Sequence, residues 1–258
     1  MTFLWLAVLA HITTDFILQT DDLARMKAEM KPKAYLKHGL ALLLCTLAAT
    51  HIYGLGVAFA FSAAAALVHT AIDYLKNLFV KAVKNPGLHT AGFVLDQAAH
   101  LYILYLLWTL FSGVLTVEPS PSVLVLYSIL LPTLDPASWF AVRGWFIENL
   151  ILSAVVVVYV LFGGAVFIRM QLDCFNVKKD AASAPNIGKC IGLLERALIL
   201  MLVMRGEMTA AGFVLAAKSI ARFKQLDDRT FAEYYLVGTL ISTLVAVGGG
   251  LALNALWH

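Results

Sequence analysis

Long apolar runs, separated by short charged or glycine- and proline-containing clusters, dominate this chain. A membrane-spanning helix needs roughly 20 apolar residues, and most of these runs have about that length. Their bounds predict helices at residues 2–19, 36–52, 55–80, 92–115, 142–169, 188–204, 208–223 and 230–255. The pattern therefore predicts an all-α fold, a polytopic transmembrane helical bundle of about seven to eight helices.

A proline-rich segment interrupts this series after the fourth helix. Its apolar stretch Val123–Leu131 is too short to span a bilayer, so we expect an interfacial linker over residues 118–144. The linker separates two predicted domains. The first is a four-helix bundle over residues 1–117, and the second is a helical bundle with basic residues over 145–258.

The composition supports a membrane protein. The chain is 61% hydrophobic and 14% charged, and its mean hydropathy is +0.83. Soluble domains are about half apolar and a quarter charged, so most of this surface must face the lipid bilayer, which is the first expected partner. A net charge of +3 does not justify a prediction of nucleic-acid binding. The three cysteines lack C-x-x-C spacing, which argues against a thiolate zinc site.

Lysines and arginines concentrate in alternate loops, which predicts the orientation of the chain in the membrane. They occur in loop 20–37, after the third helix, in loop 170–187 and before the last helix, whereas the intervening loops have almost none. This distribution predicts a multi-pass protein of the bacterial inner membrane with both termini in the periplasm. The first apolar run has no basic n-region, so we expect it to remain in the mature protein.

Three of the predicted helices carry a histidine and an aspartate four residues apart, which places both on one helical face. The pairs are His11 with Asp15, His69 with Asp73, and Asp96 with His100. At 1.5 Å per residue, the aspartates lie roughly 6 to 8 Å and the histidines roughly 12 to 13 Å from the cytoplasmic helix ends. We therefore expect a layer of three aspartates next to a layer of three histidines.

The first four helices also contain an internal repeat. A histidine is followed by an aspartate after 4 residues and by another potential ligand after 23 more, and the whole set recurs at an offset of 58 residues. The two sets are His11, Asp15 and His38, and His69, Asp73 and Asp96. The pattern indicates that one helical hairpin was duplicated, and it adds His38 to the candidate ligands.

Ionisable side chains inside a membrane cost about 2.5 to 3.5 kcal/mol each, so each needs a partner or a function. Imidazole with carboxylate suits zinc, manganese or iron, and ligands from several helices are how bundles build metal centres. Seven candidates exceed the four positions of a tetrahedral zinc, so we expect one or two divalent ions per chain. The predicted ligands are His11, Asp15, His38, His69, Asp73, Asp96 and His100, and the predicted catalytic residues are Asp15, Asp73 and Asp96.

Two other interpretations of these residues are open. A buried histidine that donates to an aspartate one turn away is a common structural pair. A chain of aspartates and histidines inside a membrane can also relay protons.

The second half carries intramembrane charges of a different kind. Lys189 and Arg196 are seven residues apart, and Lys218 and Arg222 are four apart, so each pair lies on one helix face. Arginine and lysine suit phosphate anions, which makes these four residues the predicted substrate-binding set. Neighbouring glutamates could equally neutralise them in structural ion pairs.

Several segments together resemble one protein family. They are H-I-T-T-D-F-I-L-Q-T at 11–20, His38, H-T-A-I-D-Y-L-K at 69–76, F-V-L-D-Q-A-A-H at 93–100, I-G-K-C-I-G-L-L-E-R at 187–196, A-A-K-S-I-A-R-F at 216–223 and E-Y-Y-L-V-G-T-L-I-S at 233–242. These segments are similar to the bacterial membrane proteins of domain of unknown function 3307, which implies membership without an activity. In residue types, the first half also resembles the membrane-bound metal-dependent hydrolases, in which paired histidines and aspartates on helices are taken as metal ligands.

These observations favour a membrane-embedded, metal-dependent hydrolase that acts on a phosphorylated or lipid-linked substrate from the cytoplasmic side. A transporter or channel for divalent cations or protons is the alternative, since repeats and intramembrane carboxylates are also transporter traits. A third hypothesis is a scaffold whose metal is purely structural.

Overall fold

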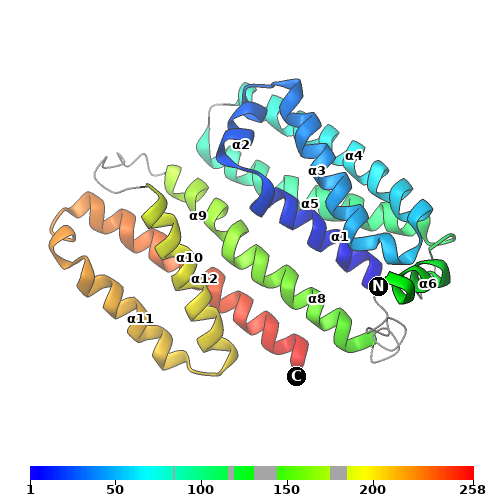
Figure 1. Ribbon diagram of the computed structural model, residues 1–258. Helices are drawn as coiled ribbons and strands as arrows, with labels where there is room; N and C mark the ends of the chain where they lie inside the picture. The colour runs from blue at the N-terminus through cyan, green and yellow to red at the C-terminus, as the bar shows by residue number, and fades with distance from the viewer. Residues whose placement is uncertain (84, 116–118, 131–143, 175–184) are drawn as a thin grey trace. The chain divides into compact units, whose positions relative to one another are not determined.

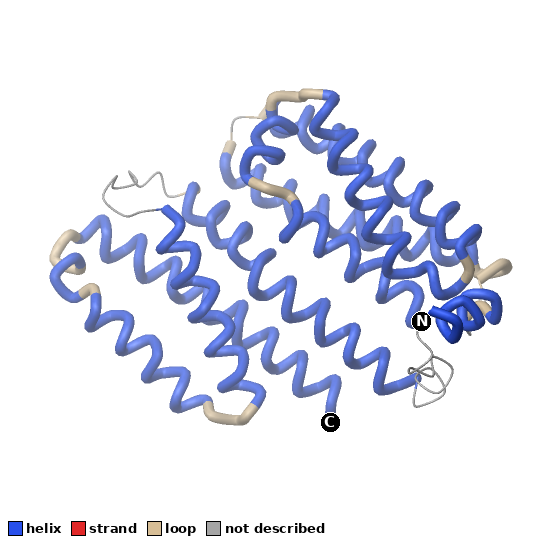
Figure 2. The backbone as a smooth tube through the Cα atoms, in the orientation of Figure 1, coloured by secondary structure: helices blue, strands red, loops and turns tan. Residues whose placement is uncertain are grey.

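The computed structural model describes residues 1–83, 85–115, 119–130, 144–174 and 185–258, and within these ranges all regular structure is helical (Figures 1 and 2). The predicted all-α class is therefore confirmed. The chain divides into two compact units. Unit 1 comprises Met1–Lys84 and Ala91–Val155, and unit 2 comprises Asn85–Thr90 and Val156–His258.

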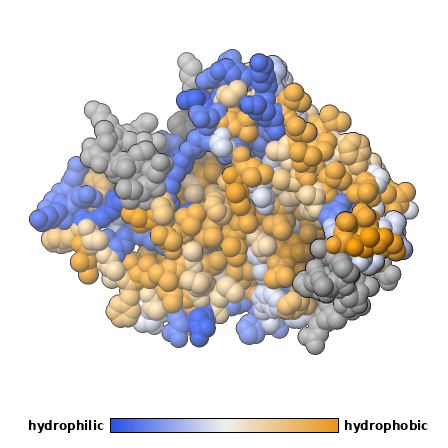
Figure 3. Space-filling view, in the orientation of Figure 1, coloured by the Kyte–Doolittle hydropathy of each residue, from blue (hydrophilic) through white to orange (hydrophobic). Residues whose placement is uncertain are grey.

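Several helices are long and apolar enough to cross a membrane, as expected for a membrane protein. Five stretches qualify within the described residues, and a sixth is added if the bent pair Thr2–Leu18 and Asp21–Ala28 is one span. Exposed leucines are abundant, and apolar residues cover most of the face seen in Figure 3. Fewer spans are found than the seven or eight expected, partly because Met208–Ala221 is shorter than the roughly 20 residues that a bilayer requires.

Unit 1 contains the helices that carry the predicted site. Its described elements are α1 (Thr2–Thr13), the π-helical turn η1 (Thr14–Leu18), α2 (Asp21–Ala28), α3 (Pro32–Thr50), the 3-10 turn η2 (His51–Tyr53), α4 (Leu55–Ala82), α5 (Pro86–Phe111) from Ala91 onward, α6 (Pro121–Leu130) and α8 (Gly144–Val158) up to Val155. Helices α3 and α4 form a packed hairpin, and Gly54 begins α4 with a φ of 115°, a conformation that glycine adopts without strain. The described part of the predicted linker is thus mostly the short helix α6.

Helix α2 occupies a segment that the apolar pattern predicts to be a loop, so that part of the prediction is wrong. The Thr20 hydroxyl accepts a hydrogen bond from the Leu23 backbone N–H at 3.2 Å and caps the helix, and Asp21 and Asp22 lie in its first turn. This helix is short and mostly polar, so a search for long apolar runs passes over it. It places Lys27 in the interior of unit 1.

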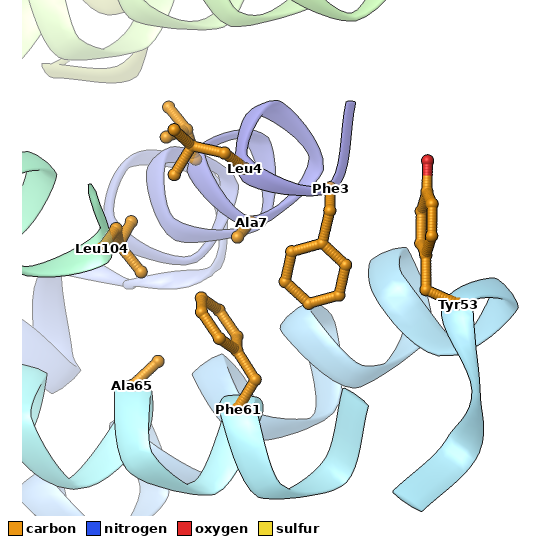
Figure 4. Packing of buried hydrophobic residues seen from close by; sticks show 8 residues of the cluster. Phe3, Leu4, Ala7, Tyr53, Phe61, Ala65 and Leu104 are labelled. Carbon is orange, nitrogen blue, oxygen red and sulfur yellow. The ribbon is translucent and has the colours of Figure 1, made fainter. Parts of the chain in front are cut away.

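An apolar core packs between α1, α4 and α5 (Figure 4). The Phe3 ring packs edge-on against Phe61 with centroids 4.9 Å apart. Ala7, Ala65 and Leu104 also belong to this core. Each of these three residues lies four positions from a candidate histidine on its own helix, so the predicted histidine layer follows the core by one helical turn.

A glycine allows α3 and α4 to approach closely at the level of the site. A Cβ added at Gly39 would lie 2.7 Å from the Thr70 hydroxyl oxygen, so no larger residue fits without a shift. Because Gly39 follows His38 and Thr70 follows His69, this contact brings the two imidazoles toward each other.

Unit 2 is also helical, with a separate core. Its described elements after Val155 are the end of α8, the π-helical turn η3 (Tyr159–Gly163), α9 (Gly164–Asp173), α10 (Pro185–Met204), α11 (Met208–Ala221), the 3-10 turn η4 (Phe223–Gln225) and α12 (Arg229–Trp257). Val160, Leu200, Val203 and Ala246 lie in the core. A Cβ at Gly250 would lie 2.6 Å from Val203 Cγ1, so α12 needs glycine there to pack on α10.

Candidate metal centre

Three histidines from three helices form one buried layer in unit 1. His11 lies on α1, His69 on α4 and His100 on α5, and none is more than 3% exposed. The His69 and His100 ring centroids are 4.1 Å apart, and the His11 centroid is 5.1 Å and 5.0 Å from them. The adjoining cavity, lined also by Leu42, measures only 10 Å³, about the minimum space for one water molecule. This layer can therefore hold a single small species but no substrate.

A second group of atoms converges beside this layer. His38 Nε2 lies 2.9 Å from His69 Nε2 and 3.1 Å from Asp15 Oδ1, and the same Asp15 oxygen lies 3.4 Å from His69 Nε2. Asp15 belongs to η1, a π-helical turn of the kind that is frequent at functional sites. Asp73 Oδ2 lies 3.3 Å from His69 Nε2 and 3.6 Å from His38 Nε2.

These distances fit ligand atoms that share a cation. Bonds of about 2.0 to 2.2 Å to nitrogen and carboxylate oxygen place neighbouring ligand atoms about 3.3 to 3.6 Å apart around a tetrahedral zinc and about 2.8 to 3.1 Å apart around a six-coordinate ion. One imidazole can donate one proton across the contact between His38 and His69, but Asp15 then competes for that proton. Several buried atoms of the cluster have no hydrogen-bond partner among the described residues: His11 Nε2, His38 Nδ1, His69 Nδ1, Asp96 Oδ1 and both ring nitrogens of His100. Unpartnered buried polar atoms are costly, and a bound ion would satisfy some of them.

The seven predicted ligands form one connected cluster. Ligand atoms within 4.8 Å of one another define three overlapping groups among the described residues. They are His11, Asp15, His69 and His100; His38, His69 and Asp73; and Asp73, Asp96 and His100. The structure thus brings together every residue of the predicted ligand set, whereas their role as ligands stays a prediction.

The two shortest contacts between different elements of the cluster are shorter than any of the histidine–aspartate pairs within one element. The pair His11–Asp15 is separated by 3.9 Å, the pair Asp96–His100 by 3.6 Å and the pair His69–Asp73 by 3.3 Å. By contrast, His38 on α3 approaches α4 and η1 at 2.9 and 3.1 Å. The interpretation of private intrahelical pairs therefore accounts for less of the geometry than convergence on a common centre.

Two lysines belong to the cluster, and the sequence pattern did not assign them to it. Lys27 of α2 is 4% exposed, forms an ion pair with Asp73 Oδ2 and donates to Gln19 Oε1 at 2.7 Å. Lys76 Nζ lies 2.9 Å from Asp73 Oδ1 and 3.0 Å from Asp96 Oδ2. The position of Lys76 three residues after Asp73 could have revealed it, because such residues are neighbours on a helix. Lys27 has no comparable signal, since it lies among several basic residues of the segment 20–37.

Lysine contacts divide the carboxylates into two kinds. Both oxygens of Asp73 face ammonium groups, and Asp96 Oδ2 accepts from Lys76 and from Gln97. For Asp15, the closest charged or titratable groups described are histidines. Asp15 is therefore the carboxylate best suited to bind a cation, while Asp73 and Asp96 are already neutralised in part.

The four predicted substrate-binding residues all lie in unit 2. Lys218 Nζ contacts Glu195 Oε2 at 2.6 Å, and Arg196 Nη2 donates to the Leu161 carbonyl at 2.7 Å. Lys218 and Arg222 lie over the Tyr235 ring, 5.4 and 6.0 Å from its centroid, and Lys189 is exposed. Lys218 and Arg196 thus have structural partners, and a role in substrate binding stays a prediction.

A comparison with protein families identifies the part of the chain that carries this centre. Residues 3–126 match the family described as "Protein of unknown function (DUF3307)". The resemblance found in the sequence is confirmed over this segment, which contains all seven candidate ligands and both lysines. The similar segments after residue 126 lie outside the match. No curated protein and no solved structure matches the chain.

Proposed function

We propose that the DUF3307 segment of unit 1 binds one divalent cation and forms the reaction centre of a membrane-embedded hydrolase for a phosphorylated or lipid-linked substrate. The supporting observation is the convergence of Asp15 Oδ1, His38 Nε2 and His69 Nε2 at 2.9 to 3.4 Å from one another. Two imidazole nitrogens and one carboxylate oxygen suit zinc, manganese or iron. His11 and His100 are close enough to complete the coordination.

The charge of the cluster favours one ion over two. Three carboxylates face two ammonium groups, so with neutral histidines the cluster carries one net negative charge. One divalent cation changes this to one net positive charge, which suits an anionic substrate. A second cation would add two more positive charges beside two largely buried lysines, at a high electrostatic cost.

Catalytic roles for the aspartates follow from their partners. When bound, the cation would supply Lewis acidity and make water easier to deprotonate. Asp96 is the candidate general base because its Oδ1 accepts no hydrogen bond from any residue that the structure describes. In this scheme Asp96 takes a proton from water, the water oxygen bonds to the electrophilic atom, and the leaving group departs with its bonding electrons. The Lys76 side chain, 26% exposed, is placed to meet an anionic oxygen, and Asp73 positions both lysines.

Elemental analysis of detergent-purified protein tests the metal centre. We expect about one divalent ion per chain, and its loss on His69→Ala or Asp15→Ala. His51→Ala is the matched control, because His51 lies in the same unit but hydrogen-bonds Tyr127 instead of the cluster. A metal-free wild-type protein, or unchanged metal content in both cluster variants, would refute the proposal.

A divalent-cation or proton transporter is the second candidate. The connected series from the partly exposed Lys76 through Asp73 and His69 to His11 favours it, since such chains conduct protons in membrane proteins. Proton or cation flux in proteoliposomes that disappears with Asp15→Asn or Asp96→Asn, without hydrolysis of phosphate esters, would support transport over hydrolysis.

A further inference from the structure

An apolar groove runs between α3 and α4 on a different face of these helices from the metal-centre cluster. Its volume is 810 Å³, far larger than the void beside the histidine layer. Its walls include Leu36, Leu40 and Leu43 from α3 and Ala63, Leu67 and Ala71 from α4. We call this feature the α3–α4 groove. Leu36 is 73% exposed and Leu67 is 74% exposed, so the groove is open along its length.

The length of the α3–α4 groove matches one hydrocarbon chain in one leaflet. Its lining residues on α3 extend from Pro32 to Leu43, a distance of about 17 Å at the helical rise of 1.5 Å per residue. Half of a bilayer core is about 15 Å thick. Both walls belong to stretches long and apolar enough to span a membrane, so we expect lipid to surround their exposed apolar side chains. An extended acyl or isoprenyl chain therefore fits the groove in length and polarity.

The two ends of the groove differ in polarity. At the end near α2 lie Met30 and Tyr35, and the Tyr35 hydroxyl donates to the Lys27 carbonyl at 3.0 Å and accepts from Asn77 at 2.9 Å. Exposed Lys33 and Lys37 lie one turn apart at the same end of α3. The opposite end, at Leu43 and Ala63, is apolar. A lipid lying here would place its head at the α2 end, where the lysines favour a negative charge.

The groove and the metal-centre cluster share a wall. Gly39 and Thr70 line the groove, and the residues that precede them, His38 and His69, belong to the cluster. At the polar end, Tyr35 bonds to the backbone of Lys27, whose ammonium group contacts Asp73. A head group at this end would lie beside the helix that supplies Lys27.

We infer that the α3–α4 groove binds one hydrocarbon chain of an anionic lipid, with the head group at the α2 end. That this lipid is the substrate rests on the proposed function, whereas the binding itself does not. A substrate bound in this groove would belong to the lipid-linked class, and its head group would contact Lys33 and Lys37 of unit 1.

Photo-crosslinking tests the inference directly. The full-length protein is placed in phosphatidylcholine vesicles that contain phosphatidylglycerol with a diazirine on one acyl chain, and labelled peptides are mapped by mass spectrometry. We expect saturable labelling of the two helix segments that form the groove, in excess of that at the exposed α12 residues Leu244 and Leu251. Unlabelled phosphatidylglycerol should remove the excess. Labelling of the groove no stronger than that of α12 would overturn the inference.

Variants identify the two parts of the site. Ala63→Trp with Ala71→Trp fills the groove and should reduce its labelling to the α12 level, whereas Ala252→Trp, at an exposed position of α12, should leave it unchanged. Lys33→Gln and Lys37→Gln should each weaken the preference for phosphatidylglycerol over phosphatidylcholine by about fivefold. If the variant that combines Lys33→Gln with Lys37→Gln kept the wild-type preference for phosphatidylglycerol, the head-group assignment would be wrong.

One further variant separates this inference from the proposed function. In His69→Ala we expect the groove labelling to persist while the metal is lost. Metal-free wild-type protein with a labelled groove would refute the hydrolase alone. A metal-loaded protein with an unlabelled groove would refute the lipid site alone.

Discussion

The two units neutralise their buried polar groups in different ways. In unit 2, Arg196 donates to the Leu161 carbonyl within the π-helical turn η3, and Lys218 pairs with Glu195. In unit 1, seven histidines and aspartates share overlapping contacts with two lysines, and six of their buried atoms lack a hydrogen-bond partner among the described residues, against two such atoms in unit 2, Arg196 Nε and the Tyr235 hydroxyl. Pairing of one donor with one acceptor is what structural stability requires. Overlapping, incompletely satisfied contacts are typical of a centre that binds something, so the comparison supports the proposal of a metal centre in unit 1.

The largest expected difference between the units comes from removing one ammonium group from each. Lys27→Met removes the ammonium partner of Asp73 Oδ2 in a buried site and leaves only Lys76 on Asp73 Oδ1, which should lower the free energy of unfolding by about 3 kcal/mol. Lys218→Met breaks a partly exposed pair and should cost about 1 kcal/mol or less. Thermal unfolding in detergent measures both. Equal losses in the two variants would contradict the distinction between the units.

Metal removal should affect unit 1 selectively. An ion present at about 100 times its dissociation constant stabilises a protein by about 2.7 kcal/mol, so a chelator should lower the melting temperature of the wild type by a corresponding amount. The same chelator should leave the melting temperature of His69→Ala unchanged. It should lower the melting temperature of Arg196→Met by as much as that of the wild type. A chelator effect of the same size in His69→Ala would place the bound ion elsewhere.

Arg196→Met tests whether the buried charge of unit 2 is structural. The change removes the hydrogen bond from the guanidinium to the Leu161 carbonyl, which should cost about 1 to 3 kcal/mol of stability. Metal content measured on the same preparation should stay at the wild-type value. A loss of metal without a loss of stability would instead connect this arginine to the centre.

The smallest expected effect concerns the close contact of α3 and α4. Gly39→Ala introduces a Cβ against the Thr70 hydroxyl and should destabilise unit 1 by about 1 kcal/mol, with partial recovery in the double variant with Thr70→Ala. Gly248→Ala in α12 is the matched control, since nothing lies within 4 Å of its added Cβ. It should be neutral or slightly stabilising, because alanine favours the helix. A destabilising Gly248→Ala would show that the loss in Gly39→Ala is not specific to the helix contact.

The helical class and the membership of the cluster could be predicted from the sequence because both depend on periodicity. Residues four apart share a helix face, so the pairs at His11, His69 and His100 identified which faces turn inward. Matching depths in antiparallel helices then indicated the histidine layer, whose rings the structure places within 4.1 to 5.1 Å of one another.

Other features of the site could not be predicted because they depend on tertiary contacts. Lys27 contacts Asp73 because α2 is bent by 93° from the preceding helix, and no residue spacing in the sequence indicates that bend. The π-helical turn that carries Asp15 has no distinctive composition either. The partners of the basic residues in the second half could not be predicted either, because Arg196 bonds to Leu161 and Lys218 lies over Tyr235, and both partners are distant in sequence.

X-ray absorption spectroscopy of the zinc-loaded protein tests the central claim most directly, because it reports the atoms bonded to the ion. We predict a shell of nitrogen and oxygen at about 2.0 to 2.2 Å with the outer-shell scattering of at least two imidazoles, reduced in His38→Ala and His69→Ala. A shell that contains sulfur, or one without imidazole scattering, would contradict the account.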